Sequence, residues 1–476
     1  MRYRLAVTTT LAVNTLSRRL GRGQGTVAGG RAGLRVDRQL LQHLTAGRQV
    51  ALVTGTNGKT TTTRLLAVAL GADGTAVVSN ETGSNMPPGH VAALAADRAA
   101  PRAVLEVDEI YLPRVLAATK ASTVVLLNLS RDQLDRSNEV RMVAGNWRAA
   151  LAASPRTIVV ANADDPLVVW GAGAAAHVRW VAAGLGWQLD AVGCPSCEGR
   201  ITFSDGDGDG DGDRDGGGDG DVAGADAMRP VSGSWACATG CGFARPEPMA
   251  TLTATRAATR AATGAATMYS GIWADGRSFE IALALPGRFN HANALMAAVA
   301  AETQGIEPAE SFAAMATLGD VAGRFTTRVV GSVRVRLMLA KNPAGWSELL
   351  NLVEGDEGPL VVSINARTAD GADPSWLWDV PFERLASRTV VATGDRCRDL
   401  AVRLHYAGVA HVMESDPLTA LHKAGAGPVE NGGGQADGGD RGPAGARVAD
   451  PENEVRVDVI GNYTAFAQLL GESAET

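Results

Sequence analysis

The sequence Thr54-Gly55-Thr56-Asn57-Gly58-Lys59-Thr60-Thr61-Thr62 sets the architecture of the N-terminal part of the chain. An apolar run precedes it at 50–53, and a helix-like run follows at 64–70. A strand, a glycine-containing turn, Lys-Thr and a helix, in this order, are typical of a phosphate-binding loop. The glycines let backbone N–H groups close on phosphate oxygens, and the start of the helix adds partial positive charge. We therefore expect every residue from Gly55 to Thr61 to contribute to a site for a nucleoside triphosphate.

Two side chains of this loop have specific expected roles. The ammonium group of Lys59 can reach the β- and γ-phosphates, and the hydroxyl of Thr60 can bind Mg²⁺. The general pattern has a glycine five residues before Gly58, where this chain has Val53, so the loop is not the generic version. A glycine-rich turn without a ligand is the alternative, and the flanking strand and helix disfavour it.

Apolar runs alternate with helical segments from about residue 49 to residue 183, and the clearest helix is expected at 138–153. This alternation predicts an α/β fold with a mostly parallel sheet, whose ligands bind at the carboxyl ends of the strands. The residues at or just past such ends include Lys59, Glu106, Asn128 and Asn162. The expected strands are 50–54, 75–79, 103–107, 123–128, 157–161 and 177–181.

A second α/β unit is expected from about residue 330. Its expected strands are 333–339, 360–364, 389–393 and 455–460, and its expected helices are 346–353, 397–406 and 464–470. Two low-complexity segments interrupt the pattern and predict disordered insertions, an Asp-Gly loop at 205–227 and a Gly-rich segment at 423–449. We therefore divide the chain into an N-terminal helical segment (1–48), a central ATP-binding domain (49–320) and a C-terminal domain (321–476).

Composition narrows the class of protein. A chain of 476 residues has room for two or three domains, and its net charge of −7 argues against nucleic-acid binding through bulk basicity. No apolar run reaches the ~18 residues of a transmembrane segment. A signal peptide competes with a short amphipathic helix at residues 1–20, but three threonines interrupt the apolar stretch and favour the helix. An ATP-using enzyme of this kind is expected in the cytoplasm.

Four of the five cysteines form two short-spaced pairs, Cys194-Pro-Ser-Cys197 and Cys237-Ala-Thr-Gly-Cys241. Two such pairs on either side of a loop suit four thiolates on one Zn²⁺. The spacing is irregular, because three residues lie between the two cysteines of the second pair and the loop that joins the pairs is long. Disulfides are the alternative, which a cytoplasmic location disfavours. A four-cysteine zinc ribbon, inserted at about 190–250, would be structural because it leaves no coordination position for a substrate.

Several segments of the chain resemble the Mur ligases, ATP-dependent enzymes that activate a carboxylate as an acyl phosphate. The resemblance implies that Glu106 binds Mg²⁺ together with Thr60. It also implies that Asn290 and Asn293 contact ATP. Arg324 would lie at the start of the C-terminal domain and also bind the nucleotide. Besides the phosphate-binding loop, the matching segments are 105–109, 128–135, 162–166, 286–293 and 323–325.

Within that family the resemblance narrows to the MurT branch, the synthetase subunits of lipid II isoglutaminyl synthase. The cysteine-pair insertion and the segments 339–346 and 369–379 select this branch. The implied fold is α/β, with a Mur-ligase-type central P-loop domain, an inserted zinc ribbon and a smaller C-terminal α/β domain. Only 48 residues precede the first strand, which agrees with the absence of an N-terminal substrate domain in that branch.

The resemblance implies ATP-dependent amidation of the D-glutamate α-carboxylate of lipid II, in peptidoglycan biosynthesis. Lys341 would bind the γ-phosphate or the acyl phosphate. The chain shows no glutaminase nucleophile, so a separate glutaminase subunit, GatD, is implied as the source of ammonia, with Asp373 orienting the partner's Cys-His pair. A plain helix N-cap is the alternative role of Asp373.

Two other functions stay open at this stage. One is an amino-acid-adding ligase of the Mur or folylpolyglutamate type, which would use an amine substrate and no partner. The other is a zinc-ribbon nucleic-acid protein with an ATPase domain, which the net acidity disfavours.

Overall fold

The computed structural model describes residues 2–20, 26–80, 84–131, 140–204, 233–261, 264–319, 325–330, 333–354, 358–425 and 456–471. The chain divides into two compact units, Met1–Val321 and Ala322–Thr476. The Asp-Gly loop predicted at 205–227 and all but the first three residues of the Gly-rich segment predicted at 423–449 lie outside the described residues.

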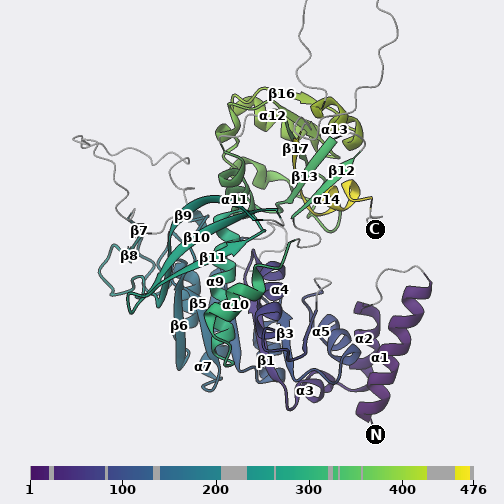
Figure 1. Cartoon of the computed structure of the whole chain (residues 1–476), viewed down its shortest axis with the longest axis vertical. Coiled ribbons are helices and arrows are strands. Elements are labelled where there is room, and N and C mark those ends of the chain that lie inside the picture. Colours follow the sequence, from purple (N-terminus) through teal and green to yellow (C-terminus); the bar gives the residue numbers. More distant parts are fainter. Residues whose placement is uncertain are drawn as a thin grey trace, which may run out of the picture. The chain divides into compact units, whose positions relative to one another are not determined.

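The first unit is built on a nine-stranded sheet in which β1 is the third strand from the β2 edge (Figure 1). The strand order is β11-β10-β9-β6-β5-β4-β1-β3-β2, and the strands from β2 to β9 pair in parallel. β9, β10 and β11 pair antiparallel at one edge. The strands are β1 (Gln49–Thr54), β2 (Val77–Ser79), β3 (Arg102–Glu106), β4 (Thr123–Leu126), β5 (Ile158–Asn162), β6 (His177–Ala182), β9 (Ala250–Ala261), β10 (Gly264–Trp273) and β11 (Ser278–Leu283).

Helices cover both faces of this sheet, because the central strands are apolar on both sides. Leu52 packs into one core with helices α3, α5, α6, α7 and α8, whereas Val53 packs into a second core with α4, α9 and α10. Such two-sided burial is typical of parallel strands. The helices are α3 (Leu40–Thr45), α4 (Lys59–Leu70), α5 (Pro87–Ala96), α6 (Leu112–Thr119), α7 (Val140–Ala152), α8 (Pro166–Ala172), α9 (Arg288–Glu302) and α10 (Pro308–Met315).

Two further helices, α1 (Arg2–Arg19) and α2 (Thr26–Val36), lie beside α5 (Figure 1). Small residues allow their close approach: a Cβ atom at Gly33 would lie only 2.1 Å from the Thr10 hydroxyl. Among the described residues, no helix, α1 included, is long and apolar enough to cross a membrane.

The cysteine-rich segment contributes a small two-stranded antiparallel sheet, β7 (Ile201–Phe203) and β8 (Trp235–Cys237). Trp235 is buried beside Ile201 and Cys194, and its indole N–H donates to the Ala163 carbonyl (3.0 Å). The segment is thus attached to the main sheet just past the end of β5.

The second unit is built on a six-stranded sheet in the order β12-β13-β17-β14-β15-β16, parallel except for the β12–β13 pair. Asp458 in its central strand is buried and pairs with Arg336 (2.7 Å) and Arg388 (3.3 Å). The elements are β12 (Phe325–Val330), β13 (Val333–Leu339), α11 (Pro343–Val353), β14 (Leu360–Ser363), β15 (Val390–Thr393), α12 (Cys397–Tyr406), β16 (His411–Met413), α13 (Pro417–Gly425), β17 (Arg456–Gly461) and α14 (Tyr463–Leu469).

The predicted α/β class is confirmed, and the ten strands predicted in the two units are present with ends shifted by a few residues. One stretch differs from the prediction. No strand was predicted in the Ala/Thr/Arg-rich segment 254–267, and it contributes to both strands of the β9–β10 hairpin.

Candidate active site

The phosphate-binding loop lies between β1 and α4, as its sequence predicts. α4 begins at Lys59, so Thr60 and Thr61 stand in the first turn, where backbone N–H groups have no partner within the helix. Gly58 has φ of 84°, and a Cβ atom there would come within 3.0 Å of the Asn293 amide oxygen. Gly55 has φ of 141° and would place a Cβ atom 3.0 Å from the backbone of Asn128. Both positions therefore require glycine.

Asn128, just past β4, holds the loop in place. Its side-chain oxygen accepts a hydrogen bond from the Asn57 backbone N–H (2.8 Å), and its amide group donates to the Asn57 carbonyl (3.1 Å). Thr56 adds a second connection, because its hydroxyl donates to the Ser130 carbonyl (3.0 Å) and accepts from the Ser130 N–H (2.9 Å). The loop is thus fixed by the neighbouring strand end before any nucleotide binds.

Lys59 is turned inward and is only 5% exposed. Its ammonium group donates to the carbonyls of Gly55 (2.6 Å) and Thr56 (3.1 Å), and it forms an ion pair with Glu109 (3.1 Å). Glu109 is not among the site residues predicted from the sequence. The signal for it was present, since Glu106, Asp108 and Glu109 place three carboxylates in four positions at the end of β3.

Glu106, the predicted Mg²⁺ ligand, is 2% exposed, and one of its carboxylate oxygens has no hydrogen-bond partner. Its backbone is held by Asn80, which donates to the Glu106 carbonyl (2.9 Å) and accepts from its N–H (2.8 Å). The Nε2–H of His90 donates to the same carbonyl (2.7 Å). Burial lowers the pKa of His90 to about 4, so the ring is neutral at pH 7.

A second pair of carboxylates lies past β5. Asp165 caps α8 by accepting from the backbone N–H groups of Leu167 and Val168, and it also accepts from Leu129 (2.8 Å). Burial raises the pKa of Asp165 to about 6. Asp164 forms an ion pair with Arg245 (2.7 Å), which comes from the cysteine-rich segment. Asp165 therefore supports the segment after β4 that clamps the loop, while Asp164 fixes the cysteine-rich segment.

The remaining predicted nucleotide contacts lie at the start of α9 and beyond it. The Asn293 side chain lies against Gly58, as described above. The Asn290 amide instead donates to the Pro286 carbonyl (2.6 Å) at the start of the same helix. Arg324 lies outside the described residues.

The four cysteines Cys194, Cys197, Cys237 and Cys241 come together, with all their sulfur atoms within 4.8 Å of one another. The Cys194–Cys241 and Cys197–Cys237 sulfur distances are 3.7 and 3.4 Å, too long for disulfides. Four thiolates about 2.3 Å from a tetrahedral zinc would lie about 3.8 Å apart. The Thr239 hydroxyl beside Cys237 lowers the pKa of that thiol to about 6, which favours the metal-binding thiolate. The residues present fit a zinc ion.

In the second unit, Lys341 is half-buried in the loop between β13 and α11. The next residue, Asn342, caps α11 by accepting a hydrogen bond from the Gly345 N–H (2.8 Å). Asp373 is exposed, and its carboxylate accepts from the backbone N–H (2.9 Å) and hydroxyl (3.0 Å) of Ser375. Asp373 therefore starts the short helical turn at Ser375–Asp379, and its carboxylate remains accessible.

The first unit also fits Mg²⁺–ATP. The loop offers a glycine cradle and the N-terminus of α4 to phosphates. The unpartnered oxygen of Glu106 is buried, and a buried carboxylate is costly without a cation. Lys59, Thr60 and Glu106 are thus the residues that could hold a metal–triphosphate complex, with Glu109 beside Lys59.

Two protein families match parts of the chain. Residues 53–186 match the Mur ligase middle domain, and residues 339–426 match the MurT ligase C-terminal domain. Among curated proteins, the chain is 28% identical over 411 residues to the lipid II isoglutaminyl synthase (glutamine-hydrolyzing) subunit MurT of Streptococcus pneumoniae, covering 81% of this chain and 83% of the relative. It is also 28% identical over 429 residues to the same subunit of Staphylococcus aureus strain COL, covering 86% and 89%.

Solved structures agree on the fold. A pseudomurein peptide ligase type C from Methanothermus fervidus aligns with a TM-score of 0.60 at 18% identity, over 91% of this chain and 79% of the other. MurF ligase from Thermotoga maritima, solved in complex with ADP, aligns with a TM-score of 0.57 at 12% identity, over 91% and 81%. The phosphate-binding loop, the domain matches and the curated relatives point the same way: the chain is similar to the Mur ligases, and over most of its length it is similar to MurT subunits.

Proposed function

We propose that this protein amidates the D-glutamate α-carboxylate of lipid II to D-isoglutamine, using ATP and ammonia from a glutaminase partner of the GatD type. The observation that carries the proposal is the similarity to two MurT subunits over 81% and 86% of this chain. Those relatives are named as subunits of a glutamine-hydrolysing synthase, which supports a partner. The reaction would take place in the cytoplasm, on lipid II at the inner face of the membrane.

The chemistry has two steps. A carboxylate oxygen of the substrate attacks the γ-phosphorus of ATP, and the bond to ADP breaks to give an acyl phosphate. The nitrogen of ammonia then attacks the carbonyl carbon, phosphate leaves, and the nitrogen loses a proton. Both steps depend on placing anionic groups side by side, so charge neutralisation and alignment are the main tasks of the protein.

The loop from Gly55 to Thr61 suits this task. In the structure the ammonium group of Lys59 donates to the Gly55 carbonyl and pairs with Glu109, within the loop itself. We infer that triphosphate binding turns the ammonium group of Lys59 from these partners to the phosphates. A Mg²⁺ ion, held by Thr60 and Glu106, would neutralise further phosphate charge. Asn290, Asn293 and Arg324 complete the nucleotide site in this proposal.

Residues of the second unit are assigned by resemblance. Lys341 would bind the γ-phosphate or the acyl phosphate. Asp373 would orient the Cys-His pair of the glutaminase partner, a role that its accessible carboxylate permits. A zinc ion held by the four cysteines would be structural, since four protein ligands leave no position for substrate.

An isotope experiment tests the proposal. Lipid II with ¹⁸O in the D-glutamate α-carboxylate is incubated with ATP, ammonium and the purified complex. Acyl phosphate formation transfers one ¹⁸O atom to the released phosphate, which mass spectrometry detects. Amide formation without ¹⁸O in phosphate contradicts the acyl phosphate. ADP release without any amide, together with incorporation of an added amino acid, would identify an amino-acid-adding ligase instead.

A further inference from the structure

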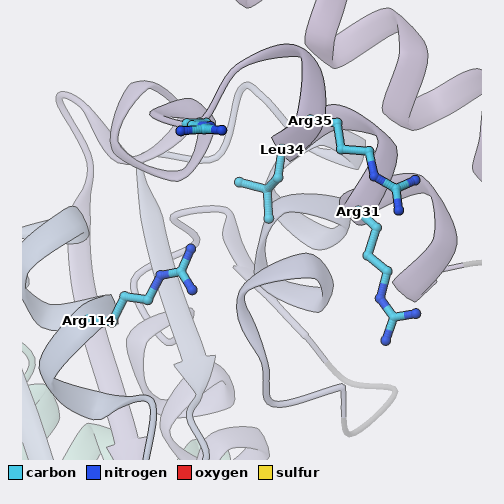
Figure 2. Close-up of a pocket in the computed structure, with 5 residues that line it drawn as sticks. Arg31, Leu34, Arg35 and Arg114 are labelled. Carbon is cyan, nitrogen blue, oxygen red and sulfur yellow. The ribbon is translucent and has the colours of Figure 1, made fainter.

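A cavity of about 560 Å³ lies among the N-terminal helices, and four of the five described residues that line it are arginines. Arg31 and Arg35 come from α2, Arg38 follows that helix, and Arg114 comes from the first turn of α6. The fifth residue is Leu34, which lies between Arg114 and the Arg31–Arg35 pair (Figure 2). No residue from the phosphate-binding loop is among them, so the cavity is separate from the ATP site.

The charges of this cavity are not balanced within the described part of the chain. Arg31 and Arg35 are one helical turn apart on α2 and therefore share a face. None of the four arginines forms an ion pair with a described carboxylate, whereas Arg102, Arg131 and Arg245 of the same unit each have an aspartate partner. The surrounding sequence has the same bias, because the first 36 residues contain seven arginines and no acidic residue although the whole chain has a net charge of −7.

Four exposed arginines that line one cavity indicate an anionic ligand with several oxygen atoms. Guanidinium presents a planar fork of N–H donors, which matches pairs of phosphate oxygens. The cavity volume falls within the range of roughly 300–1,000 Å³ that is usual for ligand sites. We propose that this arginine cavity binds a diphosphate group, with the half-buried Leu34 in contact with the apolar part of the ligand.

The position of α6 connects this cavity to the reaction. α6 follows β3 after a loop of five residues that contains Glu109, the partner of Lys59. The first turn of α6, with Arg114, therefore begins at the edge of the sheet where the ATP site lies. In lipid II a diphosphate joins the sugar to the polyprenyl chain. The cavity would hold that diphosphate while the peptide reaches the ATP site, an assignment that rests on the proposed function.

Calorimetry with inorganic pyrophosphate tests the cavity itself. The full chain is first saturated with Mg²⁺ and a non-hydrolysable ATP analogue, so that the phosphate-binding loop is filled. The triple variant R31Q/R35Q/R114Q should bind pyrophosphate at least about tenfold more weakly than the wild type. The variant R2Q/R4Q/R19Q removes the same charge from exposed positions on α1 and should bind like the wild type. Equal affinity of the two variants, or no binding to the wild type, overturns the proposal.

Flotation with neutral phosphatidylcholine vesicles distinguishes the source of the diphosphate. Vesicles that contain undecaprenyl diphosphate should retain the wild type and lose the R31Q/R35Q/R114Q variant. Vesicles that contain undecaprenyl monophosphate or phosphatidylglycerol at equal charge should retain both proteins weakly. Equal retention on all three kinds of vesicle overturns the lipid assignment.

The amidation assay gives a kinetic readout. R31Q/R35Q/R114Q should raise the KM for lipid II about tenfold or more while the KM for ATP stays unchanged. If no amide forms with any protein but pyrophosphate affinity still falls in the variant, the proposed function fails and the anion site stands. If amide forms with an unchanged KM for lipid II, the cavity does not serve the substrate.

Discussion

Replacing Asn128 with alanine should weaken ATP binding by up to about 30-fold. The side-chain amide of Asn128 makes two hydrogen bonds to the backbone of Asn57. Each hydrogen bond contributes about 1 kcal/mol, so the loop loses about 2 kcal/mol of preorganisation. Because 1.4 kcal/mol corresponds to a factor of ten, this loss corresponds to about 30-fold in affinity. Water can reach the half-buried Asn57 and offset part of the loss, which sets a lower bound of about fivefold.

Calorimetry with a non-hydrolysable ATP analogue and Mg²⁺ measures this affinity directly. The control is Asn14→Ala, which removes a buried asparagine from α1. The control should lower thermal stability without changing the affinity for the nucleotide. The clamp explanation is refuted if N128A binds within about threefold of the wild type, or if N14A loses as much affinity as N128A.

Three further predictions follow from the buried charges and the cysteines. Lys59→Met should abolish ATP turnover and lower the melting temperature, because the largely buried carboxylate of Glu109 loses its partner. The double variant Lys59→Met/Glu109→Gln should regain the melting temperature and still lack ATP turnover. His90 has a pKa of about 4 in the folded state against 6.5 when unfolded, so the free energy of unfolding should fall by about 3 kcal/mol as pH drops from about 6.5 to 4. Urea titrations of His90→Gln at several pH values should show that this part of the acid sensitivity is lost. An unchanged pH profile in the variant would contradict the prediction. Purified protein should contain one zinc per chain by elemental analysis, and Cys241→Ser should lose it; full retention of zinc in C241S would show that the four cysteines are not the site.

The local elements of the ATP site could be predicted because the signal is continuous in the sequence. Residues 50–70 contain the strand, the glycine turn and the helix together, and the structure shows these elements. The cysteine cluster was predicted for a similar reason, since two short-spaced pairs needed only one connecting loop. The loop required no long-range contact to be inferred, and the cysteine cluster required only that two pairs 40 to 47 positions apart share one metal ion.

Other features depend on contacts between distant residues. Lys59 and Glu109 are fifty positions apart, and Asn57 and Asn128 are seventy-one positions apart. The sequence placed Asn128 at the end of a strand, but only the strand order β4-β1-β3 brings it and Glu109 to opposite sides of the loop. The β9–β10 hairpin was missed because an Ala/Thr/Arg-rich repeat has no clear alternation of apolar and polar residues.

The proposed function requires that this chain join nitrogen to a carboxylate of lipid II and depend on a partner for the use of glutamine. The most direct test is mass spectrometry of lipid II after incubation with ATP and either glutamine or ammonium, with and without a co-expressed glutaminase subunit. We predict D-isoglutamine from glutamine only when the partner is present, and from ammonium also without it. If neither nitrogen source gives the amide while an added amino acid is incorporated, the chain is a conventional amino-acid-adding ligase and the assignments of the partner and of Asp373 are wrong.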